Sequence, residues 1–511
     1  MRVGILELLL DTLVPSRTDA IVGRVLRRQL YSIMPQVIAV WCRQLGHQVH
    51  YATYYGQCDP AQLLPDELDI VFISTYTQAS AVANALGVFY RMAGVMTVVG
   101  GPHAKSFPEE CQRFFDIVVS NCDKALLDDI LSGRITPPAM VSSARGPTEF
   151  PSVEERLPEI SLTAFTRGRP TRLSVISVLA STGCPYTCDF CTDWQSTYHA
   201  VSKTQLSTDI EFISKNFPRA LLAFHDANFA IRFDETMDVL ETVAEKRRNS
   251  YLMESSLSVL KGSRAARLGR TGCIFTAPGV ESWAADYGNK AGTKAITGRA
   301  KLDRVVAQFE MLHQFVPGLQ ANFLFGTDVD RGNEPAELTK DFMRRLPYVW
   351  PGVNIPTPYG GTPLYDRYLA EERILQEMPI SLYFAPYLVT TVKHYNPLEY
   401  YDQLIGIYEV MTSRRMLFER IRARSPFAIR VGHVMRTLAM RQELSEQRRV
   451  RRHLAADRRF LAFHQGRSAA LPEYYQQVLK RRLGRYAELV PPRDRIPLPR
   501  KPVRRHLDVL K

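Results

Sequence analysis

Three cysteines lie close together in the segment STGCPYTCDFC, residues 181–191. Cys184, Cys188 and Cys191 follow the spacing C-x3-C-x2-C, whereas the other five of the chain's eight cysteines are scattered singly. Thiolates at such spacing bind zinc or an iron–sulfur cluster. The segment directly follows a short apolar run that predicts a strand. We therefore expect the three thiols in a loop at the carboxyl end of that strand.

Three kinds of chemistry fit a trio of thiols. A closed zinc site needs four ligands, so it would have to recruit a distant cysteine. A disulfide with one spare thiol is a second alternative. Three cysteines on a four-iron cluster leave one iron open to a ligand that is not protein. An open position on a redox cluster suits a reaction centre, and we favour this interpretation while the other two stay open.

The elements around this loop predict an α/β protein of several domains, as the length of 511 residues requires. Residues 1–135 alternate short apolar strands with helices, which indicates a Rossmann-like, doubly wound domain. Residues 136–172 contain six prolines without periodicity and predict a linker. Residues 173–392 alternate with a longer period and predict a partial (β/α) barrel, with its chemistry at the carboxyl ends of the strands. Residues 393–511 predict a helical C-terminal domain.

The net charge of +13 is unevenly distributed. From residue 390 onward there are 27 Lys and Arg against 11 Asp and Glu, so the preceding part is slightly acidic. A solvated helical face is the favoured interpretation, and contact with an anionic lipid or substrate is the next. Aromatic residues are not interleaved as stacking platforms, which does not favour nucleic acid. No apolar run approaches about 20 residues and no signal peptide is evident, so we expect a cytoplasmic protein, with peripheral membrane contact as an alternative.

The cysteine spacing, with Phe190 directly before the last cysteine, resembles that of the radical S-adenosylmethionine (radical SAM) superfamily. The resemblance implies that the open iron of a [4Fe–4S] cluster binds S-adenosylmethionine (SAM), which is cleaved reductively to a 5′-deoxyadenosyl radical. The segments FHDANF (224–229), PGVES (278–282) and FLFGTD (323–328) resemble later strand ends of that barrel. The resemblance implies cofactor-binding roles for Phe190, Asp226, Asn228, Glu281 and Gly326. PTPYGGTPLYD (356–366) resembles the sixth-strand turn of the cobalamin-associated branch.

The N-terminal domain resembles the cobalamin-binding module that precedes such barrels. The matching segments are MPQVIAVWCRQLGHQV (34–49) and VVGGPHAKSFPEEC (98–111). The resemblance implies a corrinoid at the carboxyl edge of the sheet, near Ser74, Thr75, Gly100, Gly101 and His103. Two departures stand out: no Asp-x-His-x-x-Gly segment is present, and SNCDKAL (120–126) replaces the usual Gly-Glu-Gly-Glu. The second departure puts retention of the corrinoid in doubt.

Together these resemblances imply a radical SAM enzyme that methylates an unactivated carbon of a secondary metabolite, cofactor or lipid. Its cofactors would be a [4Fe–4S] cluster, SAM and cobalamin, with an external electron donor of the flavodoxin or ferredoxin type. One alternative is a radical cyclase, rearrangement or coupling enzyme without methyl transfer. A second alternative is a non-catalytic corrinoid or iron–sulfur carrier.

Overall fold

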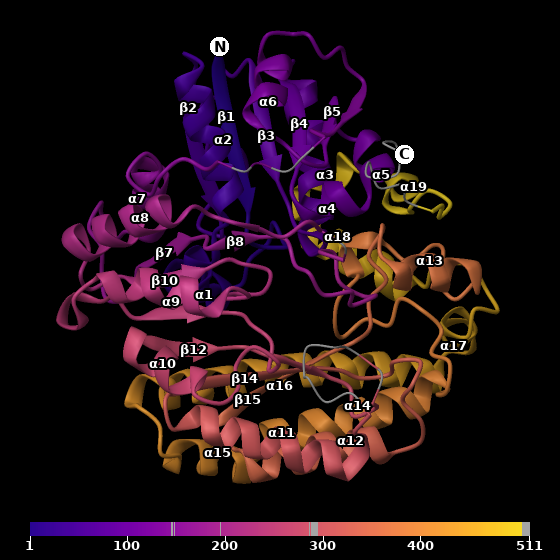
Figure 1. Ribbon diagram of the computed structural model, residues 1–511. Helices are drawn as coiled ribbons and strands as arrows, with labels where there is room; N and C mark the ends of the chain where they lie inside the picture. The colour runs from indigo at the N-terminus through magenta and orange to yellow at the C-terminus, as the bar shows by residue number, and fades with distance from the viewer. Residues whose placement is uncertain (145–146, 148, 195, 286, 288–294, 503–511) are drawn as a thin grey trace.

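The computed structural model describes residues 1–144, 147, 149–194, 196–285, 287 and 295–502. Its N-terminal part is a parallel six-stranded sheet of order β2-β1-β3-β4-β5-β6 (Figure 1). The strands are β1 (Arg2–Leu8), β2 (Gln48–Tyr54), β3 (Ile70–Ser74), β4 (Met96–Gly100), β5 (Ile117–Val119) and β6 (Ala139–Val141). Its helices are α2 (Ile33–Gln44), α3 (Ser80–Met92), α4 (Pro102–Ser106), α5 (Pro108–Gln112) and α6 (Lys124–Leu131).

Alternate residues of β1 face two separate cores, as a doubly covered strand requires. Val3 and Ile5 pack with residues of α2 and α6, whereas Leu6 and Leu8 pack with residues of α3. The sheet therefore carries helices on both faces, which confirms the predicted doubly wound domain. The carboxyl ends of β1 and β3 lie at its topological switch point, where such sheets bind ligands.

The second sheet is an open barrel of parallel strands in the order β13-β14-β12-β11-β10-β7, with β15 on the other side of β14. The strands are β7 (Val175–Val178), β10 (Leu221–Phe224), β11 (Tyr251–Met253), β12 (Cys273–Thr276), β13 (Gly279–Glu281), β14 (Gly318–Leu324) and β15 (Val349–Asn354). The intervening helices are α8 (Lys203–Asn216), α9 (Phe233–Thr242), α10 (Arg264–Thr271), α11 (Gly298–His313) and α12 (Glu334–Arg345). Since the strands are parallel, their carboxyl ends gather at one mouth.

The segment predicted as a linker contains regular structure. β6 pairs with β5 and extends the first sheet to Val141, and α7 (Leu157–Ala164) packs beside β2 and β7. Both elements escaped prediction because they are short and lie among prolines. The described part of 136–172 is thus part of the packing between the two sheets.

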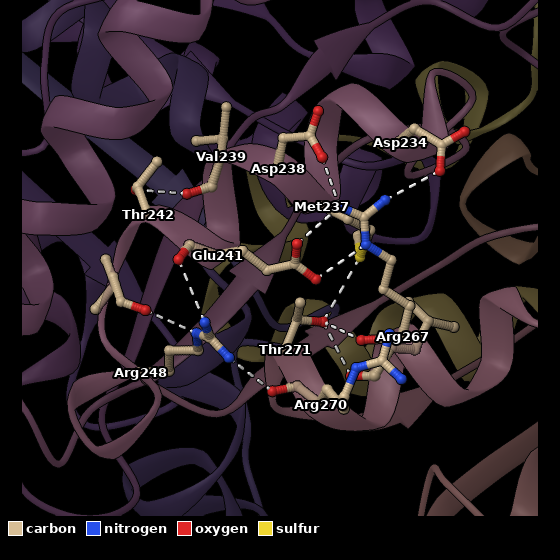
Figure 2. Close-up of polar contacts among 12 residues, drawn as sticks. Asp234, Met237, Asp238, Val239, Glu241, Thr242, Arg248, Arg267, Arg270 and Thr271 are labelled. Atoms are coloured by element: carbon tan, nitrogen blue, oxygen red, sulfur yellow. Dashed lines mark hydrogen bonds and ion pairs between the residues drawn. The ribbon is translucent and has the colours of Figure 1, made fainter.

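An ion cluster fastens α10 to α9, and Figure 2 shows it. Arg267 of α10 reaches three carboxylates on one face of α9, with nitrogen–oxygen distances of 3.0 Å to Asp234, 2.5 Å to Asp238 and 2.8 Å to Glu241. These acids are spaced so that they project from the same side of the helix. The hydrogen bonds from Arg267 to Glu241 and Asp238 raise the pKa of Arg267, so the guanidinium stays charged.

Beyond the barrel the chain is helical, as expected. The amphipathic pattern of residues 398–423 predicts one helix, whereas the structure has two, α14 (Pro397–Thr412) and α15 (Arg414–Arg422). The break comes at Ser413, whose backbone is extended and whose hydroxyl accepts a hydrogen bond from the Met416 amide at 3.1 Å. α16 (Phe427–Ala456) then packs along α14 and α15, followed by α17 (Arg458–His464) and α18 (Glu473–Leu483).

Residues 484–502, here called the C-terminal strap, return to the N-terminal domain (Figure 1). Tyr486, Ala487 and Val490 are buried in the core beneath α3. Arg485 and Tyr486 both bond Asp59, near the carboxyl edge of the first sheet. Several basic residues of the C-terminal region therefore form ion pairs with acidic residues of the same chain. Among the described residues, no helix has the length and apolar character needed to cross a bilayer.

Candidate active site

The three clustered cysteines lie in a loop at the barrel mouth, as predicted. After β7, the short strand β8 (Ser181–Thr182) pairs antiparallel with β9 (His199–Ala200), and the cysteine loop spans residues 183–198 between them. Cys184 and Cys188 are buried, and Cys191 is half-buried. At the base of the loop, Gly183 has φ +70°, and an added Cβ would lie 2.1 Å from the Thr197 carbonyl oxygen. Only glycine fits that position.

None of the eight cysteines forms a disulfide, so the disulfide alternative finds no support. Within the described ranges, no group of three or more His, Cys, Asp or Glu side chains is placed to hold a single metal ion. In a four-iron cluster each cysteine binds a different iron, so three thiols need not converge on one point. Three cysteines in one loop, none of them in a disulfide, are a donor set that fits such a cluster.

Asp226 follows β10 and holds the start of the cysteine loop. Its buried carboxylate accepts hydrogen bonds from the Ala180 amide at 3.1 Å and from the Ser181 hydroxyl at 2.5 Å. Burial raises the pKa of Asp226 to about 6, although these hydrogen bonds oppose the rise. Asp226 therefore positions the loop through its root, while the predicted contact with a cofactor stays a prediction.

Asn228, two residues further along the chain, has a buried side-chain amide without a hydrogen-bond partner among the described residues. Only 1% of it is exposed, and neither its Oδ1 nor its Nδ2 has a hydrogen-bond partner among the described residues. A buried polar group left unpaired costs about 1–3 kcal/mol. Such an amide at the end of a barrel strand fits a bound polar ligand, which is the role predicted for it.

Glu281 ends β13 in a backbone conformation that is costly for a residue with a side chain, with φ +66°. Its carboxylate packs against Gly279 so closely that a Cβ there would lie 2.0 Å from Oε1. Strained, buried acids of this kind gather at functional sites. This geometry does not test the prediction that Glu281 orients the cofactor, which stays a prediction. Its strained backbone and its burial are the physical basis for that role.

A buried lysine that sequence inspection missed stands behind this strand end. Lys301 of α11 donates hydrogen bonds to the Ser282 carbonyl at 2.5 Å and to the Ala284 carbonyl at 2.9 Å. Burial lowers the pKa of Lys301 to about 8, and the charges of Glu281 and Asp330 oppose the drop. Lys301 is buried on the same face of its helix as the apolar residues Leu302 and Val305, and that placement was the available signal.

Two further predicted residues have partners within the chain. The Gly326 amide donates to Asp330 at 3.0 Å, and its φ is +90°. An added Cβ would lie 2.3 Å from the Tyr400 ring, so close packing with Tyr400 already demands a glycine. Phe190 stacks on Tyr287, with ring centroids 5.7 Å apart and planes 16° apart. Whether either also meets the adenine stays a prediction.

The cysteine loop also crosses the open side of the barrel. The Leu364 amide of α13 (Pro363–Ala370) donates to the Asp189 carbonyl at 3.0 Å, and Arg367 pairs with the Asp189 carboxylate at 2.9 Å. Asp189 lies between two of the cysteines, whereas α13 follows β15, the last strand of the sheet. These contacts join the first and last strands of the open barrel at the mouth.

At the carboxyl edge of the N-terminal sheet, the local packing requires glycine at one of the two adjacent positions, Gly100 and Gly101, but not at the other. Gly101 has φ +95°, and an added Cβ would lie 2.9 Å from the Thr75 carbonyl and 3.2 Å from the Ser74 hydroxyl. Backbone packing therefore requires this glycine. At Gly100 an added Cβ would come only to 3.8 Å of the Val119 carbonyl, so the described chain leaves room there. Such a gap suits the predicted flat ligand.

His103 is buried and lines a cavity of about 40 Å³ together with Asn84 and residues of the C-terminal strap. His103 Nδ1 and Asn84 Oδ1 have no hydrogen-bond partner in the described part of the chain. Burial lowers the pKa of His103 to about 3, and the charge of Arg500 lowers it further, so the ring is neutral. A cavity of this size takes water and not a corrinoid ring. The predicted capping role of His103 stays a prediction.

The segment SNCDKAL starts a helix. Asp123 caps α6 by accepting a hydrogen bond from the Leu126 amide at 2.9 Å.

A functional candidate that sequence inspection missed is Glu7, fully buried at the carboxyl end of β1. It accepts a hydrogen bond from the Ser32 amide at 2.7 Å, yet burial raises its pKa to about 7. An acid interrupting the apolar first strand was the signal for it.

Comparisons with known proteins agree with this architecture. No protein-family model matches the sequence. The chain is 24% identical over 373 residues to bacteriochlorophyllide d C-8(2)-methyltransferase of Chlorobaculum tepidum, covering 70% of this chain and 80% of that protein. It is 23% identical over 314 residues to hopanoid C-3 methylase of Methylococcus capsulatus, covering 60% of this chain and 56% of that protein.

Among solved structures, the fold is similar to that of the radical SAM methyltransferase TsrM of Kitasatospora setae, solved with cobalamin and a [4Fe–4S] cluster bound. The TM-score is 0.51 at 13% identity, over 74% of this chain and 76% of that one. The matched region exceeds the barrel alone, so it includes the N-terminal α/β domain or the helical domain as well. These likenesses confirm that the chain resembles radical SAM enzymes with an N-terminal cobalamin-binding domain.

Proposed function

We propose that this protein is a radical SAM enzyme that holds a [4Fe–4S] cluster on Cys184, Cys188 and Cys191 and methylates an unactivated carbon with the help of cobalamin. One observation carries the proposal: three cysteines outside any disulfide share one loop at the mouth of an open parallel barrel, and Gly183 at the base of that loop cannot be replaced by a residue with a side chain. The similarity to named methyltransferases supports transfer of a methyl group over the alternatives without it.

When bound, the cofactors supply the radical and the methyl group, and the protein supplies position and shelter. Asp226 fixes the root of the cysteine loop through Ala180 and Ser181. Asn228 offers an unpaired amide to SAM, and Glu281 offers a carboxylate from a strained strand end. Gly100 leaves the sheet edge open toward the corrinoid.

The substrate is a small molecule of the secondary-metabolite, cofactor or lipid type. The names of the two relatives specify a bacteriochlorophyllide and a hopanoid. An external electron donor of the flavodoxin or ferredoxin type completes the proposal, and the basic C-terminal domain provides peripheral contact with a membrane.

The decisive experiment compares anaerobically purified wild type with Cys184→Ala and with Cys58→Ala, an exposed cysteine outside the loop. We expect brown colour, bound iron and reductant-dependent 5′-deoxyadenosine formation from SAM in the wild type and in Cys58→Ala. Cys184→Ala should lose all three. Iron retained at the wild-type level in Cys184→Ala would remove the basis of the proposal.

A second measurement separates methyl transfer from the other radical reactions. Cells with and without the gene are compared by mass analysis of metabolites and lipids. A product heavier than its precursor by one CH₂ indicates methylation, whereas a product that differs only by hydrogen atoms or by rearrangement indicates a cyclase or coupling enzyme. Absence of 5′-deoxyadenosine from a cluster-loaded protein would identify a carrier.

A further inference from the structure

The first three turns of α16 carry apolar side chains on the face turned to solvent. Phe427, Val431, Met435 and Leu438 recur at intervals of four, four and three residues, so they form one stripe along the helix. They are between 38% and 75% exposed. The opposite face of the same helix is buried through His433, Thr437 and Leu444. Within the part of the chain that the structure describes, nothing covers this apolar face of α16.

The neighbouring helix extends this stripe. Phe418 and Ile421 of α15 are 49% and 47% exposed. We call these two residues and the four of α16 the α15–α16 patch. Figure 1 shows α15 at the edge of the molecule away from the N-terminal domain. None of the six residues takes part in the site at the barrel mouth.

Positive charge surrounds the patch. Residues 414–441 contain eight arginines and one acid, Glu419. Glu419 pairs with Arg415 at 3.1 Å, and Arg420 is buried against Trp350. Arg414, Arg415, Arg422, Arg424, Arg436 and Arg441 are exposed. Arg422 lies over the Phe418 ring at 3.9 Å, so charge and apolar surface are presented side by side.

We propose that the α15–α16 patch docks on the surface of a membrane that contains anionic phospholipids. Helices that combine an apolar face with flanking arginines lie in the plane of the lipid interface, with the apolar side chains below the headgroups. The arginines meet the negative surface potential. The inference rests on the membrane contact of the proposed function and specifies the surface that makes it.

Charge complementarity argues against the other occupants. A second copy of this chain would place one set of six exposed arginines against another, and like charges oppose such a contact. A nucleic acid would pair with the arginines but would leave the apolar stripe in water. A bilayer with acidic headgroups satisfies both kinds of surface together.

The test uses the full chain, purified anaerobically with its cluster, and vesicles of phosphatidylcholine alone or mixed with phosphatidylglycerol. We expect co-sedimentation with the mixed vesicles only, weakening as salt is raised. The double substitution Phe427→Ser and Met435→Ser should lower the partition coefficient about tenfold or more. The matched control is Met92→Ser with Leu162→Ser, apolar residues elsewhere that are at least as exposed as the tested pair, and this variant should bind as the wild type does.

A second variant, Arg422→Gln with Arg424→Gln, should weaken binding about tenfold or more on the mixed vesicles. Iron content and thermal unfolding of both variants should match the wild type, so a loss of binding is separable from a failure of the proposed function. Binding of the patch variant at the wild-type level would overturn the inference, as would no binding of the wild type. A wild-type dimer that the patch variant converts to monomer would assign the surface to a second copy instead.

Discussion

At the scale of single residues, the buried polar groups of the barrel mouth fall into two kinds. Asp226 and Asp330 are satisfied by the chain itself, since each accepts hydrogen bonds from neighbouring backbone amides. Asn228 is not, although it lies only two residues from Asp226. Satisfied groups shape the mouth, whereas an unsatisfied one marks a place for a ligand.

Asn228→Leu tests this difference. Replacing an unpaired buried amide with an apolar group of similar shape should leave the free energy of unfolding unchanged or raise it, because no hydrogen bond is lost. SAM affinity should fall roughly tenfold or more, since the ligand loses its hydrogen-bond partner. Chemical denaturation and equilibrium binding of SAM measure the two effects. A destabilised variant with normal SAM affinity would show a purely structural asparagine.

Lys301→Met tests the buried lysine through pH. The folded-state pKa of about 8 lies below the ordinary value of 10.5, so above pH 8 the unfolded chain holds more protons on this group than the folded one. Stability contributed by Lys301 should therefore rise between pH 8 and about pH 10, by roughly 1 kcal/mol per pH unit. Denaturant unfolding should show that the free energies of unfolding of wild type and variant change differently with pH across this range. Parallel curves of unfolding free energy against pH would contradict the lowered pKa of Lys301.

At the scale of elements, strand and helix alternation was predictable because each buried strand is a short apolar run. The cysteine loop was predictable too, since Cys184 follows such a run. The break at Ser413 was not, because the apolar pattern of 398–423 continues through it and only a capping hydroxyl separates the helices. β6 and α7 were too short to leave a periodic signal.

Contacts between distant segments were also beyond prediction. Asp189 is adjacent to a motif residue, yet its partners Leu364 and Arg367 are far along the chain. Lys301 became a candidate only once α11 was seen to pack behind β13. Local patterns specify elements, whereas the partners of a side chain depend on how those elements meet.

Arg267→Gln tests the α9–α10 cluster of Figure 2. Removing the cation leaves three carboxylates on one helix face without their partner, so the free energy of unfolding should fall by about 1–2 kcal/mol. The control is Arg270→Gln, an exposed arginine on the same helix, with an expected effect below about 0.5 kcal/mol. Urea denaturation at low salt measures both. Equal effects would show that the cluster adds no specific stability.

At the scale of the whole molecule, Arg500 of the C-terminal strap joins segments that are far apart in sequence. Its buried guanidinium donates to the Met378 carbonyl at 3.2 Å and to the Tyr383 hydroxyl at 3.1 Å. It also lies 3.6 Å from Glu110 of α5 and faces the Phe107 ring. One side chain thereby connects the first domain with the segment that follows the barrel.

Arg500→Met should lower the free energy of unfolding by about 1–3 kcal/mol, because the Met378 carbonyl and the Tyr383 hydroxyl lose a charged hydrogen-bond donor while Glu110 keeps its ion pair with Arg113. The exposed Arg493 of the same strap provides the control in Arg493→Met, with an effect below about 0.5 kcal/mol. Denaturant unfolding measures both, and limited proteolysis should cut the strap of the first variant sooner. A wild-type cleavage rate would show that Arg500 does not anchor it.

The burial of Tyr486 and Val490 beneath α3 has a consequence for synthesis on the ribosome. The first domain emerges early, but the apolar face of α3 that packs on Tyr486 and Val490 stays uncovered until those two residues have been synthesised. A premature stop before them should yield insoluble protein, although it spares every cysteine and both sheets.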